Sequence, residues 1–153
     1  MTTNFPKTLR DMLTQNPAYW TETNPLFDKL EFPYLPSPAY LRHPARRGKN
    51  LIWMTLTSTN RKVVVNQWTE SWAVVTVNCY ARAESKNEDA VTDAQQRAQN
   101  MKDQVLSIVQ SKWDQFGSAW LARPTSGERE MLESGIEPIA YITLLPVEFW
   151  TED

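Results

Sequence analysis

The 153-residue sequence has little of the material from which common active sites and membrane anchors are built. Its single cysteine, Cys79, excludes an internal disulfide and every multi-cysteine zinc site. Its single histidine, His43, stands beside arginines with no carboxylate next to it, so we expect neither a catalytic nor a metal-binding role for it. The four glycines form neither a dinucleotide-binding motif nor a P-loop. No apolar run approaches the ~20 residues that cross a bilayer, and the first residues lack signal-peptide features, so we expect a chain that folds without a membrane or secretion.

The remaining polar residues give no clear sign of an enzyme. Asp89 and Asp93 are one helical turn apart, but Asp93 is better placed to pair with Arg97, and a cation site would need more ligands. Cys79 lies in an apolar stretch, which favours a buried, inert thiol over a reactive nucleophile. We expect no catalytic residue, no metal and no cofactor. Carboxylates from distant segments can still meet in a fold, so a small soluble enzyme or ligand-binding domain stays as an alternative.

Charge is distributed unevenly along the chain. The net charge is −2, yet residues 32–69 hold six basic residues and no acidic one, so they carry +6 and the rest carries 10 − 18 = −8. One copy's basic surface can therefore meet the next copy's acidic surface, a solvated loop being the alternative. The loop RHPARRGK is also the nearest approach to a nucleic-acid signal. Because the pI is near 5.5 and no nucleic-acid-binding motif accompanies the loop, we expect it to face an acidic protein.

Hydrophobic periodicity predicts a single α+β domain over residues 1–153, with a four-stranded, mostly antiparallel sheet. A long helix and a short N-terminal helix cover one face of this sheet. The connection over residues 17–50 is long and rich in proline, and its only helical signal is at 24–30. The other expected elements are a helix after Asn4 that ends at Asn16, strands at 51–57, 62–67, 72–83 and 139–150 with a turn at 58–60, a seven-turn helix after the third strand, and a short helix at 128–133.

The junction WAVVTVNCYARAESKNEDA, from Trp72 to Ala90, shows both periodicities. Its small apolar face should pack under the long helix, and its other face is mixed, as for a sheet that is wet or meets another subunit. Ser85 and Glu88 have the spacing of a capping box that would start the helix. Pro146 in the last strand suggests an edge position or a bulge. The apolar face consists of Val75, Val77, Cys79 and Ala81, and the mixed face includes Trp72, Asn78, Tyr80 and Arg82.

The order of these elements resembles that of the tail terminator (tail completion) proteins of tailed bacteriophages. The segments that carry the resemblance are VTVNCYARAE, AQQRAQNMKDQVLSIVQ and AYITLLPVEFW, and it spans roughly residues 5–150. The matching positions are Val75, Val77, Tyr80, Ala81, Ala90, Ala94 and Ala98.

The resemblance implies a structural virion protein that forms a ring, expected to be a hexamer. Such a ring caps the tail tube, stops its polymerisation and joins tail to head. The implied partners are further copies, the tail tube protein and the head–tail connector proteins, with DNA passing through the lumen without specific binding. The implied location is the head–tail junction of the virion, with assembly in the host cytoplasm and no membrane contact. Another neck subunit, a head-closure or sheath-terminator protein, is the alternative.

Seven tryptophans are more than the core of such a domain needs, and tryptophan is enriched where proteins meet. We therefore expect subunit or tube contacts in the basic loop, on the mixed strand face and at some tryptophans. The candidate residues are Arg42, Arg46, Arg47, Lys49, Trp68, Trp72, Asn78, Tyr80, Arg82 and Trp150.

Overall fold

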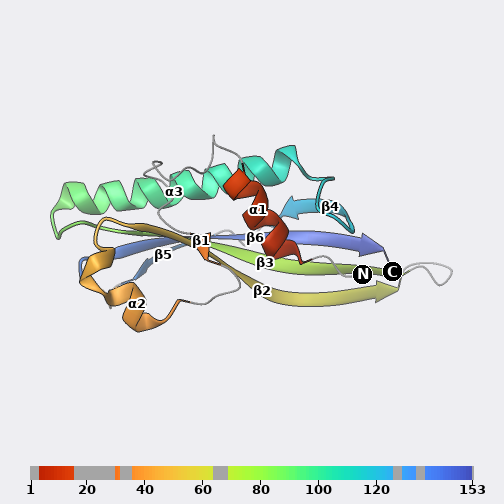
Figure 1. The fold of residues 1–153 in the computed structure, drawn as a ribbon, viewed down its shortest axis with the longest axis horizontal. Helices are drawn as coiled ribbons and strands as arrows, with labels where there is room; N and C mark the ends of the chain where they lie inside the picture. Colours follow the sequence, from red (N-terminus) through yellow and green to blue (C-terminus); the bar gives the residue numbers. More distant parts are fainter. Residues whose placement is uncertain are drawn as a thin grey trace.

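The fold is an α+β arrangement in which one long helix runs along a twisted, mostly antiparallel sheet (Figure 1). A computed structural model describes residues 4–15, 30–31, 36–63, 69–125, 129–133 and 137–152. The strands in these residues are β1 (Leu30–Glu31), β2 (Asn50–Val63), β3 (Thr69–Arg82), β4 (Ala119–Pro124), β5 (Arg129–Glu133) and β6 (Ala140–Glu152). The helices are α1 (Phe5–Gln15), α2 (Pro38–Arg42), the 3-10 helix η1 (Pro44–Arg46) and α3 (Glu88–Ser111).

The described strands form one sheet in the order β1-β2-β3-β6-β4, with β5 also paired to β6. Strands β2, β3, β6 and β4 are antiparallel neighbours, which confirms the predicted fold class. β1 adds two residues in parallel to β2. β4 and β5 pair with opposite ends of the same edge of β6. β6 is therefore an interior strand, and Pro146 lies in the gap between β4 and β5 rather than at a sheet edge.

The two strands predicted at 51–57 and 62–67 are one strand, and the predicted turn at 58–60 is wrong. Ser58 pairs with Val74 and Asn60 with Trp72, so β2 continues through this segment. The register shifts between Leu56 and Ser58, which makes a β-bulge at Thr57. A bulge inserts one residue and shifts the alternation of the strand, so the sequence pattern was misread as a break. Residues 64–67 lie outside the described part of the chain.

The short helix predicted at 128–133 is also wrong, because β5 occupies residues 129–133 and β4 precedes it. In the connection, the helix predicted at 24–30 lies outside the described residues except for Leu30, which begins β1. Within the same connection the structure adds two helical turns that the pattern did not predict, α2 and η1. Their start carries a local signal, since Ser37 caps α2 and Pro38 follows it at the first helical position.

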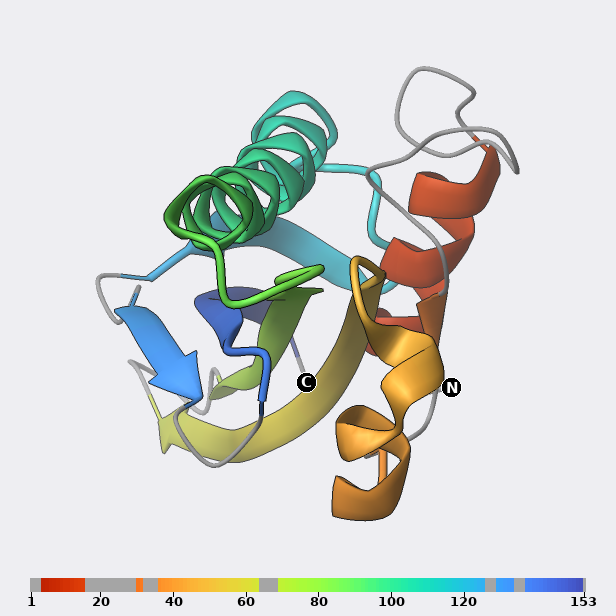
Figure 2. The ribbon, with the colours of Figure 1, turned by 90° about the vertical axis from the view of Figure 1, so that its left-hand side faces the viewer.

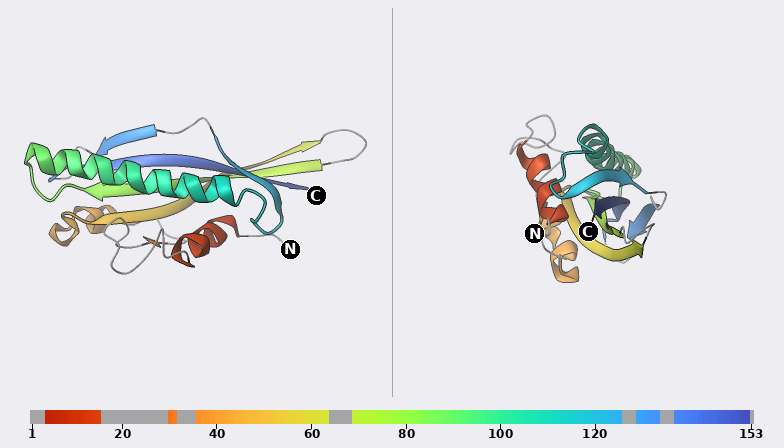
Figure 3. Two further views of the ribbon diagram at one scale, coloured as in Figure 1. Left: turned by 90° about the horizontal axis from the view of Figure 1, so that it is seen from above. Right: turned by 90° about the vertical axis from the view of Figure 1, so that its right-hand side faces the viewer.

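Both predicted helices of the first face are present, and Figures 2 and 3 show α3 lying lengthwise over the strands with α1 beside it. Asn4 caps α1 by accepting from the amide of Lys7 at 3.2 Å. α3 is not started by the predicted Ser85 capping box. Its cap is Asn87, whose Oδ1 accepts from the amide of Asp89 at 3.1 Å, while Ser85 Oγ accepts from the amide of Asn87.

The main core lies between these helices and the sheet. The small residues Ala94 and Ala98 let α3 approach β3 and β6 closely, and Thr143 Oγ1 donates to the carbonyl of Ala98 at 2.9 Å. Phe5 of α1 stacks on Phe149 of β6 with ring centroids 4.5 Å apart. The buried residues of α3 form one apolar stripe that includes Ala94, Ala98, Met101, Val105 and Ile108.

Candidate assembly surfaces

The two faces of β3 have different surroundings, as the sequence predicted. Val75, Val77, Cys79 and Ala81 are buried in the core under the helices. The mixed face is covered at one end, where Tyr40 and Leu41 of α2 pack against a second apolar cluster on the sheet. That cluster consists of Leu51, Trp53, Tyr80, Ala140 and Ile142. α2 and α3 thus lie on opposite faces of the sheet (Figure 2).

Arg82 is the centre of the covered end, and its side chain is only 1% exposed. Its guanidinium donates to four main-chain carbonyls. Two belong to the basic loop, His43 at 2.7 Å and Leu41 at 3.3 Å. The other two precede β6, Glu137 at 2.6 Å and Pro138 at 3.3 Å. Arg82 therefore ties the basic loop, the end of β3 and the start of β6 together.

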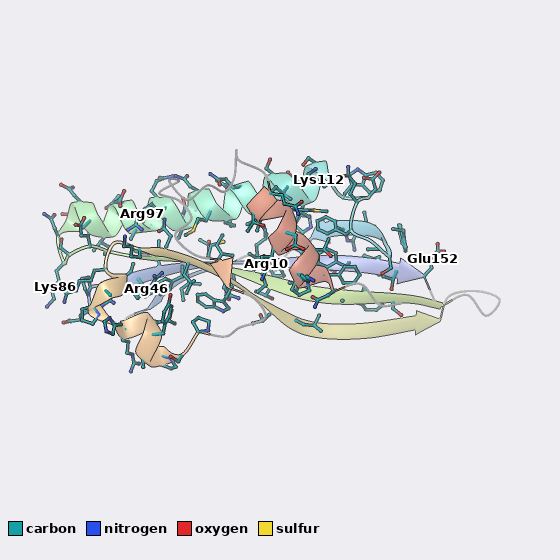
Figure 4. All side chains as sticks on the ribbon, viewed as in Figure 1. Arg10, Arg46, Lys86, Arg97, Lys112 and Glu152 are labelled. Carbon is teal, nitrogen blue, oxygen red and sulfur yellow. The ribbon has the colours of Figure 1, made fainter. Side chains whose placement is uncertain are left out.

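Two further arginines hold the same region (Figure 4). Arg97 of α3 donates to the carbonyl of Arg82 at 2.7 Å, to the carbonyl of Gly48 at 3.3 Å and to the side chain of Asn50. It also pairs with Asp93 at 2.8 Å, which confirms the predicted pair. Arg46 donates to the carbonyl of Asn50 at 3.0 Å, and its guanidinium lies 5.1 Å from the ring centre of Tyr40. Three arginines, Arg46, Arg82 and Arg97, thus hold the main chain of the loop and of Asn50, which follows it.

This arrangement changes the role of three predicted contact residues. Asn78, Tyr80 and Arg82 were predicted on a face that is wet or meets another subunit, but their side chains are buried within the chain. Asn78 donates to the carbonyl of Trp53 at 3.3 Å, and the hydroxyl of Tyr80 donates to the carbonyl of Leu41 at 3.1 Å. Buried polar groups need such internal partners. Tyr80 and Arg82 therefore support the loop and Asn78 bonds within the sheet, so none of the three side chains is available to a neighbouring subunit.

The basic loop itself divides into inner and outer cations. Arg46 is half-buried and turned onto Tyr40, so it belongs to the scaffold. The outer cations Arg42, Arg47 and Lys49 are exposed, and no carboxylate of the described residues forms an ion pair with them. These three, called the loop cations below, are the predicted contact residues of the loop that the structure leaves exposed.

At the other end of the mixed face, the described residues leave a group of aromatic side chains partly exposed. Trp72 of β3 and Trp150 of β6 are half-buried and stacked, with ring centroids 4.8 Å apart. Trp120 of β4 lies 6.5 Å from Trp150 and is 45% exposed. Glu148 accepts from Nε1 of Trp150 at 3.0 Å and from Nε of Arg123 at 2.9 Å. The three tryptophans with Arg123 and Glu148 form a continuous surface across three strands, which we call the aromatic surface.

Sequence reasoning found only part of this surface. Trp72 and Trp150 were predicted as contact residues, and the structure brings them together. Trp120 and Arg123 were missed, since the segment that forms β4 was not recognised as a strand, and Glu148 of β6 was missed because its partner Arg123 lies in β4. Trp68 lies outside the described residues.

The described residues contain neither a metal-binding cluster nor a reactive thiol. They contain no group of three or more His, Cys, Asp or Glu side chains that could hold a metal ion. Cys79 is fully buried, and burial raises its pKa from the ordinary 9.0 to about 12, against smaller opposing effects of Thr143 and Lys102. The thiol is therefore protonated and unreactive at neutral pH, as predicted. None of the described helices is both long and apolar enough to cross a membrane.

Two comparisons with known proteins identify no family for this chain. No protein-family model matches the chain, and no curated protein matches it.

Proposed function

We propose that this protein is a structural subunit of a phage-like virion, a tail terminator that forms a ring at the end of the tail tube and joins it to the head. The observation that supports this best is the aromatic surface, a partly exposed patch on a sheet face that α2 covers elsewhere. Exposed apolar patches on folded proteins mark contacts with other proteins. The role requires no catalytic residue, no metal and no cofactor.

The two surfaces suit different partners. The loop cations have complementary acids on the chain itself, along α3, and are argued below as a contact between copies. The aromatic surface has no such counterpart among the described residues, and its one cation and one carboxylate already pair with each other. We therefore assign the aromatic surface to another protein, the subunit of the tail tube. DNA passes through the ring without specific binding, because basic contacts to phosphate would hold it back.

The test uses the purified chain and the tail-tube protein of the same virus. Native mass spectrometry and negative-stain imaging are expected to show closed rings, and added rings are expected to stop tube elongation. Trp120→Ser should still form rings but cap tubes poorly. Trp113→Ser is the matched control, because Trp113 is equally exposed, at 48%, and lies outside the aromatic surface. A strict monomer at every concentration, or rings that never stop tube growth, would contradict the proposed function.

A further inference from the structure

α3 presents a solvent side of one charge sign. Every charged residue of α3 that is exposed is acidic, whereas its two cations are half-buried. Asp93 is paired with Arg97 of its own helix, and the remaining acids have no ion pair with any described residue. These remaining residues, called the helix acids below, are Glu88, Asp89 and Asp103.

The basic loop is the complement of this helix in charge and in position. Its exposed cations are likewise free of ion pairs within the described chain. α2 and η1 lie on one side of the sheet and α3 lies on the other (Figures 1 and 2). The main chain of the loop is also held by Arg82 and Arg97, so binding needs to order only the side chains of its cations.

We propose that the loop cations of one copy bind the helix acids of a second copy. Because the loop cations and the helix acids are two different surfaces of the same copy, each contact leaves one loop and one helix unused. Contacts of this head-to-tail kind continue from copy to copy, and they form a ring when the rotation between neighbouring copies closes. This inference rests on the proposed function, in which copies of the chain form a ring, and it identifies the residues through which neighbouring copies touch.

A nucleic acid is the other occupant that a basic loop suggests. The surroundings argue against it, because exposed carboxylates lie beside the loop. A Cβ at Gly48 would lie only 3.6 Å from Cβ of Glu84, whose side chain is exposed, and the exposed Glu137 pairs with Lys86 at 3.2 Å. The Glu84 carboxylate would repel a continuous line of phosphates, whereas α3 also presents uncharged side chains such as Thr92 and Gln96 between its acids.

The experiment is a charge exchange in the full chain, read by native mass spectrometry and sedimentation. One variant carries Arg42→Glu, Arg47→Glu and Lys49→Glu, and a second carries Glu88→Lys, Asp89→Lys and Asp103→Lys. Each is expected to weaken association by at least ~100-fold, since like charges at a contact cost several kcal/mol. The chain with all six substitutions should recover association, as should a mixture of the two variants.

Two controls keep the result interpretable. Circular dichroism shows whether each variant folds, and the milder set Glu88→Gln, Asp89→Asn and Asp103→Asn replaces the lysine set if that one does not. Random-sequence duplex DNA is the second probe.

The proposal is overturned if either reversal leaves association unchanged while rings still form, and the proposed function then stands on the aromatic surface alone. It is also overturned if loop reversal abolishes DNA binding but not association. A wild-type chain that never associates refutes both the contact and the ring.

Discussion

The arginine at the covered end of the sheet should fix the shape of the basic loop, and Arg82→Met is the perturbation that tests this. Methionine keeps the apolar stem of the side chain and removes every donor. Arg82 contacts four main-chain carbonyls. Two belong to residues that precede it by 39 and 41 positions, and two belong to residues that follow it by 55 and 56 positions. They are therefore brought together by the guanidinium and not by local sequence.

The magnitude follows from the geometry. The two short contacts, 2.6 Å to Glu137 and 2.7 Å to His43, are hydrogen bonds from a charged donor, worth about 1.5–3 kcal/mol each. The two contacts at 3.3 Å are weaker. Removing a buried charge returns part of its desolvation cost, which offsets some of the loss. We expect Arg82→Met to lower the free energy of unfolding by about 2–4 kcal/mol.

Two assays separate a local role from a general one. Urea unfolding gives the free energy, and Arg47→Met is the matched control, expected within about 0.5 kcal/mol of wild type because Arg47 is exposed and contacts no described carboxylate. Hydrogen exchange followed by NMR should show lost protection at the amides of Arg46 and Lys49, which bond within the loop. Amides in the middle of α3 should keep theirs. If Arg82→Met matches the control, or if protection falls equally everywhere, Arg82 does not position the loop.

Two smaller predictions concern α3 and the core beneath it. Asn87→Ala should lower the free energy of unfolding by about 1 kcal/mol, as loss of a helix N-cap does, and Ser85→Ala should lower it by less. Urea unfolding of both variants measures the two losses. A larger loss for Ser85→Ala would show that Ser85 caps the helix, as the capping box predicted. Cys79 keeps its proton in the folded state up to pH about 12, while the unfolded thiol loses it near its ordinary 9.0, so wild-type stability falls as the pH rises above that value. The stability advantage of wild type over Cys79→Ala should therefore shrink by about 1.4 kcal/mol between roughly pH 8 and 10 in reducing buffer, and a constant difference would show that the thiol is not buried.

The sequence predicted those elements whose burial is periodic over many residues. The α3 stripe and the alternating faces of β3 repeat long enough to exceed local noise, and the structure contains both. β2 was divided because Ser58 and Asn60 are turn formers, yet their pairing with β3 outweighs that preference. β4 and β5 are short and polar, and only their pairing with β6 makes them strands.

The site shows the same limit more strongly. Exposed cations could be predicted, because a loop with four basic residues and no acid cannot bury them all. The burial of Arg82 could not, since nothing near it in the sequence supplies a partner. Its partners are main-chain carbonyls, which every residue has, so no pattern of residue types predicts which of them Arg82 will contact. The position of Trp120 could not be predicted either, because β4 is a strand only through its pairing with β6. This pairing brings Trp120 beside Trp150.

Because β3 is long, the same face of the sheet has different surroundings at its two ends. Trp72 and Arg82 are on the same face and ten residues apart, which is about 33 Å along an extended strand. At one end the face is occupied by the chain's own loop, held by Arg82, and at the other it carries the open aromatic surface. Sites this far apart without shared partners contribute independently to stability and binding. Changes in the loop should therefore alter contacts between copies without altering the aromatic surface, and this separation allows ring formation and tube capping to be measured one at a time.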